Sequence, residues 1–176
     1  MGRRLASVAA IALALVVSGC GNDDPVDAGQ ASETKTAPKP AVAGPFFGEC
    51  GSVTDDEVTK AFAVPALPVI WRNSVGCVWE ASGVLGPSVS FSWYRGSPIG
   101  RESAGSDLIG RPPEKIEVQG HPGFRGTSGD SSLCEIGVQF GDDFIHWSVT
   151  YNLVPPTADP CKVATDLAEL SVSRAK

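Results

Sequence analysis

The sequence predicts an α+β domain, in which an antiparallel sheet of about five strands carries two terminal helices linked to it by two disulfides. Three observations predict this fold. Clear helical periodicity occurs near the two ends of residues 46–176. Between them apolar and polar residues alternate in short runs, as in antiparallel strands with one face in solvent. Four cysteines remain once Cys20 is set aside, an even number that favours disulfides in an exported chain.

The first residues have the form of a bacterial lipoprotein signal peptide. Two arginines precede an apolar run, Leu5–Val17, that is too short to span a bilayer comfortably. The run leads into Val-Ser-Gly-Cys, which looks like a lipobox ending at Cys20. We therefore expect residues 1–19 to be removed and Cys20 to carry diacylglycerol. The alternatives are a simple transmembrane anchor, or an ordinary secretory peptide with an incidental cysteine.

A lipidated Cys20 would hold the protein on the extracytoplasmic face of the cell membrane, because two acyl chains bind far more firmly than one. Removal of Arg3 and Arg4 with the signal peptide takes the formal net charge from −6 to −8. Such an acidic chain is a poor partner for nucleic acid, and it lacks a polybasic membrane contact. The expected partners are the membrane, through the lipid, and an unknown envelope protein or small ligand.

A linker separates the predicted anchor from the predicted domain. Residues 20–45 begin with the lipidated cysteine and continue with acidic, small and proline residues that lack apolar periodicity. Such a composition cannot bury a core and is typical of a disordered tether. The remaining residues, 46–176, have the usual length of one domain, without repeats or a second linker.

The first helix is predicted after Thr54. Thr54 and Glu57 have the spacing of a capping box, and Val53 and Val58 have the spacing of a hydrophobic staple. Pro65 ends the helical pattern.

The last helix is predicted to begin at Asp159-Pro160, since proline is favoured at the first helical position. Arg174 and Lys176 suit its C-terminal end, where the helix dipole favours cations. Its inner face is predicted to consist of Ala164, Leu167, Ala168 and Ser171.

Residues between the helices predict five strands, since their apolar positions alternate with polar ones. A turn is predicted at Gly120-His121-Pro122-Gly123, and residues 96–112 are ambiguous between loop and a short helix around 102–109. The predicted strands lie around residues 75–79, 88–94, 116–118, 134–140 and 145–151.

The four remaining cysteines allow three connectivities. The sequence favours Cys50–Cys77 with Cys134–Cys161, because each pair is 27 positions apart and joins a helix start to the core face of a strand. A four-cysteine metal site or a redox-active pair is not expected, because the chain has no C-x-x-C spacing.

No catalytic set, metal site or cofactor site is predicted, so we do not expect an enzyme. His121 falls in a predicted turn, and His146 alternates outward on its strand. Ser128 and Asp130 lie close in sequence but outside the strand–turn–helix context of a nucleophile elbow. Two separated histidines without a third ligand are insufficient for zinc.

Aromatic side chains next to arginines are the candidate binding residues: Trp71, Arg72, Trp93, Tyr94 and Arg95. Tryptophan, tyrosine and arginine are enriched at recognition sites. The alternative for Trp93 is a place in the core beside Phe91. Tyr94 alternates onto the face of Ser88, Ser90 and Ser92, which would form a flat surface rich in hydroxyls.

The cysteines and their surroundings resemble a known family. The resemblance lies in Cys50-Gly-Ser-Val-Thr-Asp-Asp-Glu-Val, in Cys77-Val-Trp, in Cys134 at the start of a strand and in Asp159-Pro160-Cys161 at the start of the last helix. Together with the lipobox, these motifs resemble an actinobacterial lipoprotein domain of unknown function, the family that includes the mycobacterial lipoproteins LprB and LprC. The resemblance covers about residues 46–175. It implies attachment to the cell envelope and brings no catalytic residues.

The sequence therefore favours a membrane-anchored, non-catalytic module that binds a ligand or protein in the cell envelope. An envelope hydrolase with an unrecognised active site is the first alternative. A structural scaffold lipoprotein, acting only through a flat interface, is the second.

Overall fold

The structure is a computed structural model that describes residues 40–81 and 86–176. The predicted signal peptide, Cys20 and most of the predicted tether lie outside the described residues. Within the described part, no helix combines the length and the apolar character needed to cross a bilayer.

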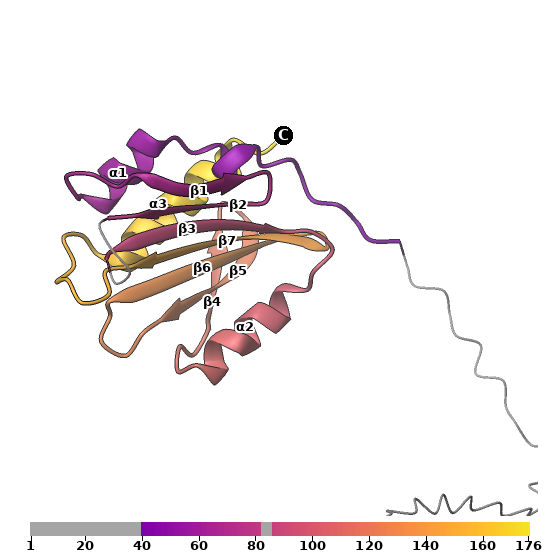
Figure 1. Cartoon of the computed structure of the whole chain (residues 1–176). Coiled ribbons are helices and arrows are strands. Elements are labelled where there is room, and N and C mark those ends of the chain that lie inside the picture. Colours follow the sequence, from indigo (N-terminus) through magenta and orange to yellow (C-terminus); the bar gives the residue numbers. More distant parts are fainter. Residues whose placement is uncertain (1–39, 82–85) are drawn as a thin grey trace, which may run out of the picture. The chain divides into compact units, whose positions relative to one another are not determined.

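A seven-stranded antiparallel sheet forms the centre of the fold (Figure 1). The strand order is β1-β2-β3-β7-β6-β5-β4. The strands are β1 (Val69–Asn73), β2 (Gly76–Glu80), β3 (Ser88–Tyr94), β4 (Glu114–Val118), β5 (His121–Thr127), β6 (Leu133–Phe140) and β7 (Asp143–Thr150). The helices are the 3₁₀ segment η1 (Glu49–Ser52), α1 (Asp55–Phe62), α2 (Ile99–Leu108) and α3 (Pro160–Ser173).

The α+β class and the antiparallel sheet are confirmed, but the sheet has seven strands and not about five. The first additional strand, β5, begins at the predicted turn. The turn itself occupies only Gln119 and Gly120, whose φ angles of 49° and 84° suit a tight hairpin. Pro122 is tolerated in β5 because it pairs only with β4, and the pairing with β6 begins at Gly123.

The other additional strand, β1, lies at an edge of the sheet. Its register with β2 shifts between Val69 and Trp71. This irregularity breaks the two-residue alternation that identified the other strands, which explains why the sequence did not reveal it.

Helix α1 begins as the sequence predicts. Thr54 Oγ1 accepts a hydrogen bond from the Glu57 amide at 3.3 Å, and the Thr54 amide donates to Glu57 Oε2 at 2.9 Å. Val53 and Val58 are both buried, as a hydrophobic staple requires. The helix ends at Phe62, before Pro65.

Helix α3 packs on β6 and β7, and α1 contacts α3. The Asp159 side chain caps α3 by accepting a hydrogen bond from the Lys162 amide at 2.8 Å. All four residues predicted for its inner face are buried: Ala164, Leu167, Ala168 and Ser171. The two terminal helices therefore lie over one face of the sheet, which we call the covered face.

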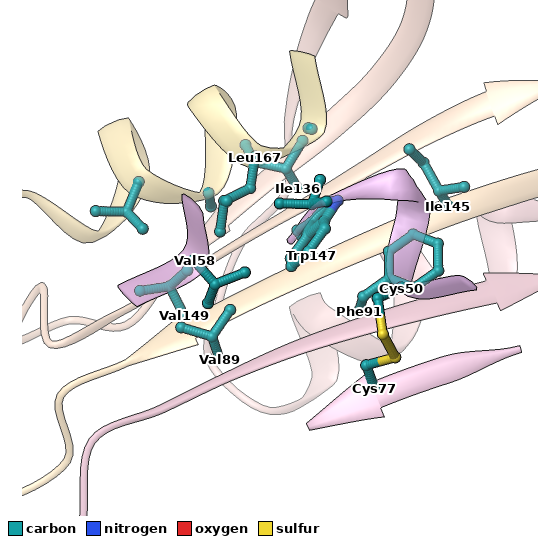
Figure 2. Close-up of a cluster of buried hydrophobic side chains, with 14 of the residues drawn as sticks. Cys50, Val58, Cys77, Val89, Phe91, Ile136, Ile145, Trp147, Val149 and Leu167 are labelled. Carbon is teal, nitrogen blue, oxygen red and sulfur yellow. A yellow bond between two sulfur atoms is a disulfide. The ribbon is translucent and has the colours of Figure 1, made fainter. Parts of the chain in front are cut away.

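The core fills the space between the covered face and the helices (Figure 2). Trp147 lies at its centre. Its ring stacks on that of Trp79, with the ring centroids 5.9 Å apart, and is tilted against that of Phe91, with the centroids 5.1 Å apart. The indole N–H of Trp147 donates to Ser171 Oγ at 3.0 Å. This bond satisfies a buried donor, and it ties the sheet to α3.

Two disulfides link the covered face to the segments packed on it, and both are the pairs that the spacing favoured. Cys134 in β6 is bonded to Cys161 in the first turn of α3. Cys77 in β2 is bonded to Cys50 (Figure 2). Cys50 lies in η1, so this bond fixes the segment that leads into α1 and not α1 itself.

The folded part begins before the predicted boundary at residue 46. Val42 pairs with the turn between β6 and β7, since its carbonyl accepts from the Asp142 amide at 2.8 Å. The Gly44 amide donates to Asp143 Oδ2 at 3.0 Å. The last residues of the predicted tether therefore belong to the domain, because the hairpin turn supplies hydrogen-bond partners that composition does not reveal.

The ambiguous segment contains a true helix, α2, and this helix lies on the opposite side of the sheet from α3. Helix α2 packs on β5 and β6. On that side, β1, β2, β3 and β7 make no comparably extensive contact with a described helix.

Candidate functional site

The structure separates the predicted binding residues between two faces of the sheet. Trp93 lies on the covered face, where its ring is buried against Phe47. Arg95 lies over the Trp93 ring, 4.9 Å from its centroid. Tyr94, the intervening residue, lies on the opposite face. The five candidates therefore do not form one site.

Trp71 and Arg72 also lie on different sides. Arg72 forms ion pairs with Glu49 at 3.0 Å and with Asp55 at 2.5 Å, next to α1. Trp71 is 49% exposed. Its ring lies over Gly76, where a Cβ atom would come within 3.0 Å of it. Gly76 therefore makes room for the Trp71 ring.

The side chains opposite the covered face form a half-exposed polar surface on β3 and β7. The strand register places Ser90 opposite Ser148 and Ser88 opposite Thr150. Val78 continues the first of these rows on β2. We call this surface the serine face and define it by Trp71, Val78, Ser88, Ser90, Ser92, Tyr94, Ser148 and Thr150.

Tyr94 closes one end of the serine face. Its ring stacks on Phe144 with the centroids 4.4 Å apart and the planes 12° apart. Burial raises the pKa of the Tyr94 hydroxyl, and the charge of Glu102 on α2 raises it further. Tyr94 is therefore a neutral donor and acceptor at physiological pH.

A buried carboxylate, Glu135, lies beside the serine face. Glu135 is only 2% exposed and follows Ser90 and Ser148 in the same cross-strand row. Arg111 donates from Nε to Glu135 Oε1 at 2.8 Å and from Nη2 to Oε2 at 3.2 Å. Ser106 on α2 also donates to Oε1, and His146 Nε2 lies 3.1 Å from Oε2. These contacts fix α2 and the segment after it on the sheet.

The Glu135 network determines the charge state of its carboxyl group. Burial alone would raise the pKa of Glu135. Hydrogen bonds from His146, Arg111 and Ser106 outweigh that effect and lower the pKa to about 2. Glu135 is therefore a permanent anion under physiological conditions, and its charge is compensated by Arg111.

The same network contains a set of residue types known from hydrolases. Ser92 on β3 lies directly opposite His146 on β7, and His146 contacts Glu135 on β6. A serine, a histidine and a carboxylate on three neighbouring strands are the components of a nucleophilic triad. However, His146 is only 8% exposed, and both Glu135 oxygens already accept hydrogen bonds from Arg111. A buried carboxylate whose two oxygens both accept hydrogen bonds from an arginine is typical of a structural role.

The other polar residues that the sequence singled out have local roles. His121 packs its ring against Phe140 at 4.2 Å. Ser128 donates to Asp130 at 2.6 Å within a turn, and hydrogen bonds from Ser128 and Ser132 lower the pKa of Asp130 to about 2. Among the described residues no group of three or more histidine, cysteine or acidic side chains is arranged to hold a metal ion.

Sequence reasoning missed Glu135, Arg111 and Ser106. Glu135 occupies a polar position in an alternating strand, which predicts a solvated side chain. Its burial depends on α2, which covers this part of the sheet, and no local pattern indicates that contact.

Two of the surface hollows beside the described helices have partly apolar linings. One, of about 460 Å³, lies between α1 and α3 and is lined by Glu57, Lys60, Lys162 and Asp166 among others. The other, of about 400 Å³, lies between α2 and the β4–β5 hairpin. Its lining is mostly apolar, with Ser103, Lys115 and Gln139 as its polar members. This groove and the serine face lie on the same side of the sheet, on either side of α2.

The described residues thus define a small disulfide-linked α+β domain, with one face closed by helices and the other only partly covered. The chain belongs to the family described as protein of unknown function (DUF3558), which matches residues 15–174. This agrees with the resemblance drawn from the cysteine motifs. No solved structure matches the chain.

Relatives in three mycobacterial species share the name "putative lipoprotein LprB". Those of Mycobacterium bovis and Mycobacterium tuberculosis are each 42% identical over 177 aligned residues, which cover 98% of this chain and 95% of the relative. That of Mycobacterium leprae is 43% identical over 138 residues, covering 76% of this chain and 73% of the relative.

Proposed function

We propose that this protein is a lipid-anchored, non-catalytic binding module of the cell envelope, and that the serine face is its binding surface. The observation that carries the proposal is the asymmetry of the sheet. Terminal helices and both disulfides close the covered face, whereas α2 covers only β5 and β6 on the other side. A sheet face that is rigid, half-exposed and partly aromatic is suited to recognition.

The chemistry of the serine face supports contact with a polar partner. Its hydroxyls can both donate and accept hydrogen bonds. Trp71 at the β1 edge and Tyr94 at the far end of β3 add apolar area with little conformational entropy to lose. The residues that define the face carry no charge, and one carboxylate, that of Glu80 on β2, lies opposite Ser88 at its border. A partner would therefore meet mainly hydroxyl groups and one acidic side chain.

Attachment to the extracytoplasmic side of the membrane is supported by the lipobox-like sequence at Cys20 and by the names of the mycobacterial relatives. The expected oxidised cysteines fit that location, because disulfides persist outside the cytoplasm. Removal of the lipid should release the domain without unfolding it, since no described core residue precedes Phe47.

Site-specific crosslinking in intact cells tests the binding surface. A photo-crosslinking amino acid at Ser90, on the serine face, should give a discrete adduct with an envelope component. The same group at Glu169, exposed on α3, is the matched control and should give none. Trp71→Ala should reduce the Ser90 adduct. Equal adducts from both positions, or none from Ser90, would show that the serine face is not the binding surface.

The juxtaposition of Ser92, His146 and Glu135 favours a second candidate, an envelope hydrolase. This candidate requires Ser92 to react with a serine-directed fluorophosphonate and His146→Gln to abolish that reaction. If the folded domain is not labelled, the hypothesis that Ser92, His146 and Glu135 form a catalytic triad is wrong. Labelling at Ser92 that depends on His146 would instead overturn the non-catalytic proposal.

A further inference from the structure

The chain enters the domain at one end of the sheet, and several segments meet there. Phe46 pairs with the C-terminal residue, donating to the Lys176 carbonyl at 2.8 Å and accepting from its amide at 3.0 Å. Asp143 accepts hydrogen bonds from the amides of Gly44 and Gly96 at 3.0 and 2.8 Å. These bonds hold the entering chain, the end of β3 and the C-terminus together (Figure 1).

This end of the domain carries exposed apolar side chains. Val42 is 55% exposed, Phe46 59% and Val75 46%. The Val75 carbonyl accepts from the Trp93 amide at 2.8 Å, and the Phe46 ring lies edge-on to the Trp93 ring at 5.7 Å. Arg95 and Lys176 lie beside them. We call this surface, defined by Val42, Phe46, Val75, Arg95 and Lys176, the entry end.

A buried donor lies directly beneath the entry end. Among the described residues, no hydrogen-bond partner contacts the buried indole N–H of Trp93. Phe46 packs against the same ring.

We infer that the entry end docks on the lipid bilayer that holds the anchor, with Val42 and Phe46 inserted at the interface. The inference rests on the proposed lipid anchor. Its physical basis is the short chain between Cys20 and Val42, which would keep the entry end close to the membrane. A coil of about 20 residues has a root-mean-square span of roughly 25 Å.

The tether makes a weak contact sufficient. The composition of residues 20–45 predicts a flexible tether, and a flexible linker of this length gives a local concentration in the millimolar range. Apolar contacts that would be too weak to recruit a free protein can therefore keep a tethered one docked. Arg95 and Lys176 can extend to lipid headgroups while their stems lie on apolar surface. Asp142, the buried Asp143 and the C-terminal carboxylate are acidic groups at this end, so we expect insertion and not bulk charge to dominate.

Docking would set the orientation of the serine face. Tyr94 lies at the end of β3 nearest the entry end, and Ser88 lies at the far end of the same strand. The serine face would then stand upright from the bilayer, open to partners from the side.

Fluorescence quenching of the lipidated mature protein tests the docking. The protein is reconstituted into vesicles of phosphatidylcholine with a minor fraction of phosphatidylglycerol, with or without bromine on the acyl chains. Trp71→Phe serves as the parent chain, because it leaves Trp93 as the tryptophan closest to the entry end while Trp79 and Trp147 are fully buried. We expect brominated lipid to quench the parent chain.

Phe46→Ser and Val42→Asp, each made in the parent chain, should lose this quenching. Both positions are exposed, and Val42→Asp changes no core side chain, so a folded variant is available for the test. Leu153→Ser is the matched control at an apolar residue that is 81% exposed, and it should quench like the parent chain.

Quenching that persists in both entry-end variants, or is absent from the parent chain, would overturn the docking. Flotation with the vesicles is measured in parallel and tests the anchor separately. If the mature protein fails to float because Cys20 carries no lipid, the proposed anchor is wrong. If every variant floats and the quenching disappears only in Phe46→Ser and Val42→Asp, the anchor and the docking are both supported.

Discussion

The two faces of the sheet are stabilised in different ways. On the covered face, large apolar side chains pack under α3 and two disulfides fix the overlying segments. On the other face, the buried carboxylate of Glu135 forms hydrogen bonds with Arg111, Ser106 and His146. These bonds position α2. Burial spreads stability over many contacts, whereas the Glu135 network concentrates it in one group. The serine face takes part neither in the apolar core nor in the Glu135 network.

Truncation of the central tryptophan should have the largest effect. Trp147→Ala removes a fully buried ring and the bond to Ser171, and it should lower the free energy of unfolding by about 4 kcal/mol. Trp71→Ala, the matched change on the serine side, should cost less than about 1 kcal/mol. Denaturant unfolding measures both. Equal losses would show that Trp71 is part of the core.

Removal of one disulfide should come next. Each pair spans 27 residues, so the chain-entropy model gives about 3.5 kcal/mol for either double substitution, Cys50→Ala/Cys77→Ala or Cys134→Ala/Cys161→Ala. Thermal unfolding of both variants compares the two bonds at equal loop length. A large difference between them would mean that native contacts, and not loop closure, decide their value.

Substitution of the buried carboxylate tests the other face. Glu135→Gln leaves Arg111 without its ionic partner and should cost about 3 kcal/mol. Ser106→Ala, which removes one neutral donor to the same carboxylate, should cost about 1 kcal/mol. Hydrogen exchange should show that the loss is greatest in α2. Loss spread evenly over α3 would contradict a separate role for the network.

Acid should remove the Glu135 contribution. Because the folded-state pKa is lowered from 4.5 to about 2, the stabilisation is complete above about pH 4.5 and is lost as the pH falls toward 2. Glu57 and Asp130 also have lowered pKa values, so wild type alone cannot isolate the effect. The stability difference between wild type and Glu135→Gln should therefore shrink in acid. A constant difference would show that Glu135 does not change protonation in this range.

The smallest effect is expected on the serine face itself. Ser90→Ala and Ser148→Ala should change the free energy of unfolding by no more than about 0.5 kcal/mol, because both side chains are half-exposed. Crosslinking from a probe at Ser90 should nevertheless weaken in the Ser148→Ala variant. A loss of stability without any change in crosslinking would show that these hydroxyls stabilise the fold and do not contribute to binding.

The parts of the fold that depend on local chemistry were predictable from the sequence. Thr54 with Glu57 and Asp159 with Pro160 mark helix starts, because caps act within a few residues. The alternation in β3 and β7 identified which side chains share a face. Equal spacing favoured the cysteine pairs that the structure joins.

The parts that depend on distant contacts were not predictable. Glu135 meets Arg111 across 24 residues and His146 across 11, and each of these residue types is ordinary in its own segment. Strand β5 was hidden because Gly120 and Pro122 are turn residues in most contexts. Only the neighbouring strands decide that Pro122 can remain in a sheet.

The position of Cys50 has a mechanical consequence. A pull on the N-terminal chain first meets the hydrogen bonds of Val42, Gly44 and Phe46, and then reaches a covalent bond to β2 at Cys50. Force would peel a few residues from the entry end and then stop at the disulfide. A domain anchored through its N-terminal chain could therefore extend that chain by a few residues under load while its sheet stays intact.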